Sequence, residues 1–320
     1  MGLIKKPSEI EAKKNISMMI YGQPGMGKTT LALSAPSAVL FDADNGVNRI
    51  NAAHQTDTLQ VSSWEQIPEA LKEVVDGGYK TIAIDTLGKA VGFIEKYIVE
   101  HDLAANKGKH VWTYPNGALT LKGFGERKNI FKAFLNSVMT SGLSVILIAH
   151  EKEEKRDNNV VKRADAGSDG FAADIYKDLD LVGYIYGIGN ERHITFQTND
   201  EHFCKKTGSM QNDYTIPAIV DANGNAVGNN NFIEKVILPT YANDQERSRK
   251  MHQEYDKLVA DIKSRVEAIK TVDDANAFVE FMKGAAMIYD SKVIAGNEFT
   301  SRINTLGFKF DAKQKKYVAA

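Results

Sequence analysis

The chain has 320 residues, of which 43% are hydrophobic and 25% are charged, so it can fill a hydrophobic core, and we expect one large domain with a small appendage. Its formal net charge of −1 excludes a globally basic nucleic-acid-binding protein, although it leaves room for a local basic patch. Cys204 is the only cysteine, which excludes an intrachain disulfide and favours a reducing compartment.

The N-terminal segment, residues 1–15, lacks the apolar stretch that a signal peptide needs. The longest apolar run, LSVILIA at 143–149, is far too short to span a bilayer. We therefore expect a cytoplasmic protein with no membrane partner.

The first motif lies in the stretch IYGQPGMGKTTL, residues 20–31, which fits the spacing G-x-x-x-x-G-K-[ST]. In such a P-loop, backbone N–H groups point at phosphate oxygens, the lysine brings charge to the β- and γ-phosphates, and the threonine hydroxyl binds Mg²⁺. An apolar strand precedes the motif and a helix can begin after it, so we expect a nucleotide site and not an empty glycine turn. The predicted contact residues are Gly22, Gln23, Pro24, Gly25, Met26, Gly27, Lys28, Thr29 and Thr30.

Strand and helix patterns alternate after this motif. Apolar runs predict strands at 37–44, 80–86 and 143–150, and helical patterns occupy 63–76, 89–103 and 125–141. This alternation is typical of an α/β fold with a mainly parallel central sheet and with ligands at the carboxyl ends of the strands.

The pattern changes after residue 178. Alternating segments on either side of the turn GNER predict a β-hairpin, whereas residues 212–232 are rich in loop signals. A polar helical pattern begins near residue 243 and leads into a small tail. The predicted organisation is an N-terminal segment at 1–15, a core at 16–242 and a mainly helical appendage at 243–320.

Acidic residues end two of the predicted strands. Asp85 closes the strand TIAID and is predicted to hold Mg²⁺ together with Thr29, from a strand beside that of the P-loop; the alternative is a cap for the next helix. A base must also orient the attacking water, and Asp42 and Asp44 are the candidates. Both could instead be turn residues before Asn45.

His150 ends the strand VILIAH, where a polar side chain can sense the γ-phosphate. A histidine at a strand end is more often a structural residue with a hydrogen bond, and this alternative stays open.

Together these motifs resemble the RecA-like recombinase and helicase core over residues 16–208, and most strongly the small phage-encoded RecA-like ATPases of single-strand annealing and recombination. The resemblance implies ATP and Mg²⁺ as cofactors, single-stranded DNA as a partner, a homo-oligomeric ring or filament, and a single-strand-binding protein as a further partner. It also implies that Asp44 stands where the family has its catalytic glutamate, one methylene shorter, and that Lys28, Asp85 and His150 complete the catalytic set.

The resemblance further implies two DNA-binding segments. The first, residues 106–132, interleaves cations with aromatic rings, as single-strand binding requires, although the rings could equally anchor a solvated loop to the core. The second, residues 151–171, carries mixed charge and is read as a loop. The predicted DNA contacts are Lys107, Lys109, Trp112, Tyr114, Arg127, Lys128, Lys162 and Arg163.

Lys205 and Lys206 loosely match the place from which RecA-like subunits present cations to a neighbour's γ-phosphate, although surface solvation is an alternative. Three other functions stay open: a hexameric helicase motor, a small-molecule kinase and a non-hydrolysing switch. A kinase would need an arginine-rich lid, yet Arg49 is the only arginine between residues 1 and 120.

Overall fold

The computed structural model describes residues 3–156, 159–208 and 210–319. The chain divides into two compact units. One spans Lys13–Asp244, and the other contains Gln245–Ala320 together with the N-terminal residues up to Ala12. The sequence predicted these divisions after residues 15 and 242. In the structure, the N-terminal residues up to Ala12 belong to the same unit as the C-terminal residues.

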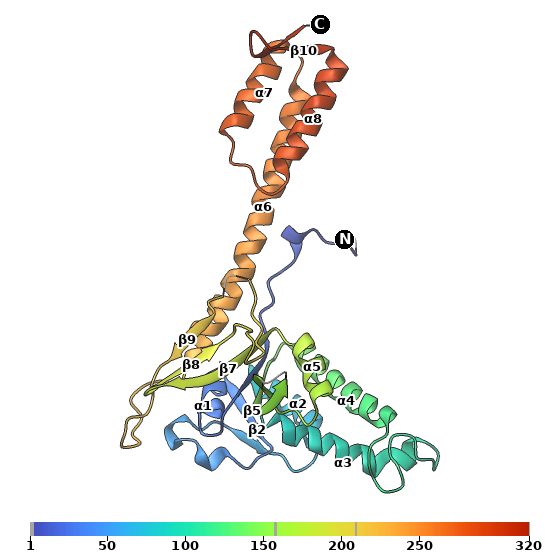
Figure 1. Cartoon of the computed structure of the whole chain (residues 1–320), viewed down its shortest axis with the longest axis vertical. Helices are drawn as coiled ribbons and strands as arrows, with labels where there is room; N and C mark the ends of the chain where they lie inside the picture. The colour runs from blue at the N-terminus through green and yellow to red at the C-terminus, as the bar shows by residue number, and fades with distance from the viewer. Residues whose placement is uncertain (1–2, 157–158, 209, 320) are drawn as a thin grey trace. The chain divides into compact units, whose positions relative to one another are not determined.

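The larger unit is built on a sheet that has nine strands among the described residues (Figure 1). Its main path runs in the order β3-β2-β4-β5-β1-β7-β8-β9, and β6 pairs with the far end of β5. Pairing is parallel from β3 through β7 and antiparallel for β8, β9 and β6. The strands are β1 (Ser17–Gly22), β2 (Ala38–Asp42), β3 (Thr58–Gln60), β4 (Thr81–Asp85), β5 (Ser144–Arg156), β6 (Asn159–Ala164), β7 (Leu181–Ile188), β8 (Glu191–Thr195) and β9 (Asp213–Ile216).

Helices cover both faces of this sheet, so its central strands are buried. This is why their sequences are continuous apolar runs. One face packs against side chains such as Ile67, Ile94 and Phe131. The other packs against Leu31 and Ile237. The expected α/β class is confirmed. The helices of this unit are α1 (Lys28–Ala32), α2 (Gln66–Asp76), α3 (Leu87–Ala105), α4 (Leu121–Thr140) and α5 (Asp169–Asp178), with short 3₁₀ turns η2 (Val47–Arg49) and η3 (Ala52–His54).

Two segments differ from the sequence-based expectation. Residues 151–164 were expected to form a loop, but β5 continues past His150 and pairs with β6 as a hairpin. Opposite charges such as Glu153 and Lys162 face each other in this ladder, which stabilises a strand pair despite its polarity. The polar helix also starts earlier than expected, with a π-helical turn η4 (Ile233–Ile237), because its first apolar side chains are buried against the core.

The second unit is mainly helical, as expected. It holds most of α6 (Leu238–Ala268), together with α7 (Val272–Gly284) and α8 (Ser291–Leu306), around a core that includes Ile262, Phe278 and Phe299. A small hairpin of β10 (Phe308–Asp311) and β11 (Lys316–Ala319) follows, and the 3₁₀ turn η1 (Pro7–Glu9) belongs to the N-terminal residues. Within the described ranges, no helix combines the length and apolar character needed to cross a membrane.

Cys204 lies in the core of the larger unit. Its thiol donates to the carbonyl oxygen of Thr195 at 3.4 Å. Burial raises the pKa of the thiol to about 12, so the reactive thiolate is scarce at neutral pH.

Asp102 anchors the segment between α3 and α4. Its buried carboxylate accepts from the backbone N–H groups of Trp112 and Thr113 at 2.9 Å each and from the Thr113 hydroxyl at 2.6 Å. Burial by itself would raise the pKa of Asp102, but these hydrogen bonds outweigh it and hold the pKa well below its usual range. The segment is therefore fixed to the core at Trp112 and Thr113.

We expect Asp102→Ala to destabilise the protein by about 1–3 kcal/mol, because it leaves buried N–H donors without an acceptor. A depressed carboxylate pKa stabilises the fold above the unfolded-state pKa of about 4, and this contribution is lost as the pH falls through the folded-state pKa. Thermal unfolding from pH 7 down to pH 3 should thus show the wild type approaching the variant. Equal unfolding temperatures at pH 7 would contradict the anchoring role.

Candidate functional site

The parallel register brings the predicted polar residues to one edge of the sheet. Gly22 of β1 pairs with His150 of β5, and Asp85 of β4 pairs with Ile148 of β5 and with Asp42 of β2. Strand β5 therefore lies between β1 and β4, which corrects the expectation that the Asp85 strand adjoins the P-loop strand. A cavity of about 190 Å³ opens at this edge, and its lining includes Gly25, Lys28, Thr29, Asp44, Arg49, Asp85 and His150.

The P-loop encloses the ammonium group of Lys28. The side chain is only 5% exposed, and its Nζ donates to the carbonyl oxygens of Gly22 at 2.9 Å and Gln23 at 2.8 Å. Burial lowers the pKa of Lys28, while the nearby carboxylates of Asp85 and Glu151 oppose that shift. The loop thus holds a desolvated cation that a phosphate anion would stabilise.

Thr29 and Asp85 come together as predicted for a metal site. The Thr29 hydroxyl donates to Oδ2 of Asp85 at 2.6 Å. Burial, followed by the charges of Asp42 and Asp44, raises the pKa of Asp85, whereas the Thr29 hydrogen bond and Lys28 lower it. These oxygen donors, beside several carboxylates whose charges repel, fit Mg²⁺ bound with a nucleotide.

The structure distinguishes the two candidate bases by their surroundings. Asp42 is fully buried and accepts from the backbone N–H groups of Gly46 and Val47, both at 2.9 Å, so it holds the turn after β2. Asp44 is half-buried, lines the cavity and forms an ion pair with Arg49 at 3.2 Å. Of the two acids, Asp44 is the one that faces the cavity.

His150 also lines the cavity. Its Nδ1 lies 3.5 Å from Nζ of Lys28. This places the imidazole beside the cation that is expected to meet the terminal phosphates, so a γ-phosphate sensing role stays a prediction with suitable geometry.

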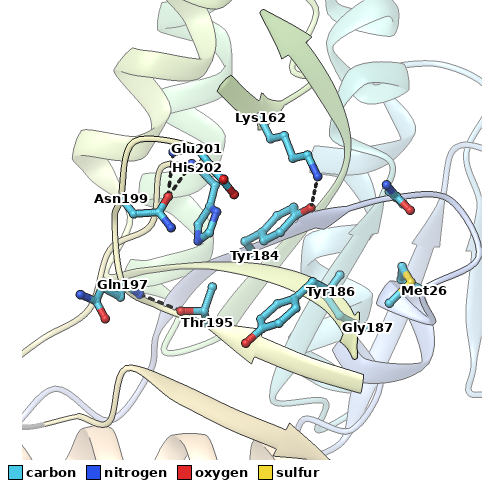
Figure 2. A pocket seen from close by; sticks show the side chains of 12 residues that line it. Met26, Lys162, Tyr184, Tyr186, Gly187, Thr195, Gln197, Asn199, Glu201 and His202 are labelled. Atoms are coloured by element: carbon cyan, nitrogen blue, oxygen red, sulfur yellow. Dashed lines mark hydrogen bonds between the residues drawn. The ribbon is translucent and has the colours of Figure 1, made fainter. Parts of the chain in front are cut away.

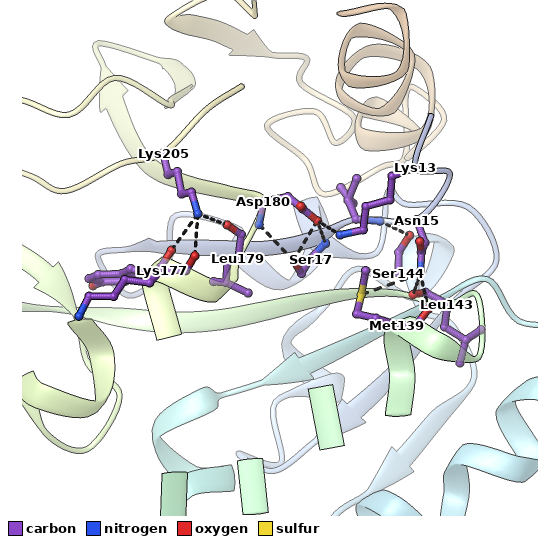
Figure 3. Close-up of polar contacts among 12 residues, drawn as sticks. Lys13, Asn15, Ser17, Met139, Leu143, Ser144, Lys177, Leu179, Asp180 and Lys205 are labelled. Carbon is purple, nitrogen blue, oxygen red and sulfur yellow. Dashed lines mark hydrogen bonds and ion pairs between the residues drawn. The ribbon is translucent and has the colours of Figure 1, made fainter. Parts of the chain in front are cut away.

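The two lysines predicted to act on a neighbouring subunit are engaged within their own chain. Lys205 donates to the carbonyl oxygens of Lys177 at 3.0 Å and Leu179, at the end of α5 (Figure 3). Lys206 donates to the carbonyl of Met210 at 2.7 Å. Carbonyl groups at a helix end need such donors, so Lys205 has a structural role at the end of α5. The trans-acting role of the two lysines stays a prediction.

Arg127 is likewise a structural residue and not a free phosphate contact. It is 3% exposed, forms an ion pair with Glu95, donates to Ser168 at 2.7 Å and lies over the rings of Phe124 and Phe171. Separating it from these partners would leave a buried cation uncompensated. The contacts therefore give Arg127 a structural role, and its predicted DNA role stays a prediction.

The other predicted DNA contacts are dispersed. Lys107, Lys109 and Tyr114 are exposed, whereas Trp112 is half-buried against the core. Two of the cations have carboxylate partners: Lys128 pairs with Asp174 at 2.7 Å, and Arg163 pairs with Glu154 at 3.3 Å. Lys162 points into a separate cavity beside Tyr184 (Figure 2).

Arg192 was missed by the sequence analysis. It belongs to β8, and its Nη1 lies so close to the P-loop that a Cβ at Gly27 would clash with it. Gly27 has a φ of +78°, and this left-handed backbone conformation is what favours glycine there, since the Arg192 side chain is flexible enough to shift. Within the described part of the chain, Arg192 has no carboxylate partner. No local signal marks it, because only the antiparallel pairing of β8 with β7 brings it to the loop.

A family model described as an AAA domain matches residues 14–207. No curated protein matches the chain. Among solved structures, the chain is similar to the KaiC-like protein PH0186 from the hyperthermophilic archaeon Pyrococcus horikoshii OT3, with 11% identity and a TM-score of 0.36 over 65% of this chain and 87% of that chain.

We expect Asp44→Asn to retain ATP binding and to slow hydrolysis about 10²-fold or more, the usual scale for losing a general base. Asp42→Asn should instead lower thermal stability, because an amide offers one acceptor oxygen where the turn uses both carboxylate oxygens. Nucleotide binding, turnover and thermal unfolding of both variants check this. A slow but fully stable Asp42→Asn protein would move the base to Asp42.

We expect Arg192→Gln to weaken ATP binding about tenfold, because it removes the unpaired guanidinium nearest the phosphate loop. Titration with a fluorescent ATP analogue measures the change. The exposed Lys72 on α2 provides a control in Lys72→Gln, which should bind as the wild type does. Equal affinities for all three proteins would exclude Arg192 from the site.

Proposed function

The chain belongs to the AAA-domain family, and from this premise we propose that it binds ATP with Mg²⁺, hydrolyses it, and couples this to single-stranded DNA in phage recombination or strand annealing. The observation that carries the ATPase part is the 2.6 Å contact between the Thr29 hydroxyl and Asp85 beside the buried Lys28. Residues that are distant in sequence thus meet as nucleotide hydrolysis requires.

The residues of the cavity have separable roles in this proposal. The backbone of the P-loop and the ammonium of Lys28 hold the phosphates, and Thr29 and Asp85 hold the metal ion. When bound, Mg²⁺ neutralises charge on the phosphate oxygens. Asp44 orients a water molecule for attack on the γ-phosphorus and takes its proton. His150, beside Lys28, senses whether the γ-phosphate is present.

The DNA part rests on the resemblance to RecA-like annealing proteins and on exposed cations such as Lys107 and Lys109. A homo-oligomeric ring or filament and a single-strand-binding protein as partner belong to the same proposal. Lys205, Lys206 and Arg127 have partners within their own chain. The proposal therefore does not use the trans-acting role of the two lysines, and of segment 106–132 it uses only the exposed cations.

One observation favours a second candidate, a switch that binds ATP without hydrolysing it. Arg49 forms an ion pair with Asp44 at 3.2 Å and also donates to its backbone carbonyl at 3.1 Å. A carboxylate that is hydrogen-bonded to a guanidinium is less available to accept a proton from a water molecule. If this pair persists when ATP is bound, turnover would be negligible.

The test is the ATPase rate of the wild type with and without single-stranded DNA, alongside Lys28→Ala and the control Lys72→Ala. We expect DNA to raise the wild-type rate, Lys28→Ala to fall to background, and Lys72→Ala to match the wild type. ATP binding without turnover under either condition would support the switch. An unchanged rate in Lys28→Ala would remove the P-loop assignment.

A further inference from the structure

A second cavity of about 560 Å³ lies next to the P-loop (Figure 2). Gln23 and Met26 of the loop line it, whereas Pro24, Gly25 and Gly27 line the first cavity. Its remaining walls come from β7, β8, β6 and the segment after β8. The phosphate loop therefore contributes to both cavities, although the predicted nucleotide chemistry uses only one.

Aromatic rings form one wall of this cavity. Tyr184 and Tyr186 occupy alternate positions of β7, so they share a face of the strand; their ring planes are 6° apart, with centroids separated by 6.1 Å. His202 stacks on Tyr184 at 4.7 Å, and His193 stacks on Tyr186 at 5.5 Å. Such ring faces can stack with nucleobases of any sequence.

The polar groups of the cavity are suited to a base more than to a string of phosphates. The side chains of Thr195, Gln197 and Asn199 line it. The Thr195 hydroxyl and Oδ1 of Asn199 bond to the backbone of their own chain, so the amide of Gln197 and the amide nitrogen of Asn199 are the groups suited to base edges. Lys162 donates to the Tyr184 hydroxyl at 3.2 Å, and Glu201 is also in the lining. One cation balanced by one carboxylate gives little net attraction for a polyanion, so stacking must provide most of the affinity.

Hydrogen bonds connect this wall to the predicted nucleotide site. The Tyr184 hydroxyl donates to Oε2 of Glu151 at 2.9 Å, and Glu151 directly follows His150 in β5. On the other side, the backbone carbonyl of Gln23 accepts from Lys28 at 2.8 Å. A molecule in the cavity would therefore contact Gln23, which accepts from Lys28, and Tyr184, which is hydrogen-bonded to the neighbour of His150 in β5.

We infer that this cavity, walled by Tyr184, Tyr186 and His202, binds an unstacked base of single-stranded DNA and that its occupation accelerates ATP turnover. The inference rests on the proposed function and moves the principal DNA contact away from segment 106–132. A base stacked there would order Gln23 and the His150–Glu151 end of the shared strand, both of which adjoin Lys28.

The experiment compares Tyr186→Leu with a matched control, Tyr114→Leu, in which an exposed tyrosine of segment 106–132 is removed. Binding to a fluorescent oligothymidine is measured by anisotropy over a range of salt concentrations, together with the ratio of ATPase rates with and without DNA. We expect Tyr186→Leu to lose about tenfold or more in affinity, the usual scale for a lost stacking partner, and to lose the DNA-dependent rate increase. Tyr114→Leu should bind as the wild type does.

Two further variants distinguish the loss of base stacking from a folding defect and from the loss of a positive charge. Tyr186→Phe keeps the ring but loses the hydroxyl that donates to Asp213 at 2.6 Å, so it should retain most of the DNA affinity. Lys162→Met should lower the slope of log affinity against log salt by about 0.7, the share of a single phosphate contact. If Tyr186→Leu does not fold, two other measurements still test the inference. One is the salt dependence of DNA binding by Lys162→Met, and the other is the binding of an oligonucleotide of abasic sites, which should not bind.

The outcomes separate the two proposals. Wild-type DNA affinity in Tyr186→Leu, or an affinity loss in Tyr114→Leu instead, would overturn the cavity assignment while leaving DNA binding intact. A wild-type protein that hydrolyses ATP but binds no single-stranded DNA would overturn the DNA part of the proposed function and this inference with it. Binding of the abasic oligonucleotide as tightly as oligothymidine would show that bases are not recognised here.

Discussion

The hydrogen bond between Thr29 and Asp85 joins the start of α1, which follows the loop after β1, to the end of β4, a strand that does not neighbour β1 in the sheet. The register of β5 supports it, because the last residue of β1, Gly22, pairs with His150 and the last residue of β4, Asp85, pairs with Ile148. The same register places His150 beside Lys28 and opens the cavity between them. A shift of β5 by one residue would therefore turn His150 away from Lys28, since side chains alternate between the faces of a strand, and would change the register in which β1 and β4 meet.

The site keeps opposite charges in a poorly hydrated environment. Burial raises the pKa of Asp85 and lowers the pKa of Lys28, so each group is displaced toward its neutral form. A phosphate anion and a divalent cation would stabilise the charged form of both groups together. A phosphate or metal ion bound there would therefore interact strongly with these two charged groups. Ionisable groups with shifted pKa values in a cavity are typical of a functional site.

The sequence predicted the features that depend on local patterns. The P-loop, the acid at the end of β4 and the parallel sheet follow from spacing and from runs of buried residues, and the structure brings Lys28, Thr29 and Asp85 together as expected. The sequence could not show where a side chain finds a partner far along the chain. Arg127 contacts Glu95 and Ser168, which are 32 and 41 residues away, and Lys205 reaches carbonyl groups nearly 30 residues upstream. Charge patterns alone cannot separate such internal partners from a surface that awaits DNA.

The burial of Cys204 has a practical consequence for the study of this molecule. Because its thiol is enclosed in the core and its pKa is raised to about 12, maleimide-type reagents should spare it in the folded protein. A cysteine introduced at any exposed position would then be the single reactive thiol, with no background substitution needed. Fluorophore or spin-label pairs could be placed on the β5–β6 hairpin and on the segment that follows β8, and the distance between these walls of the second cavity could be followed during turnover.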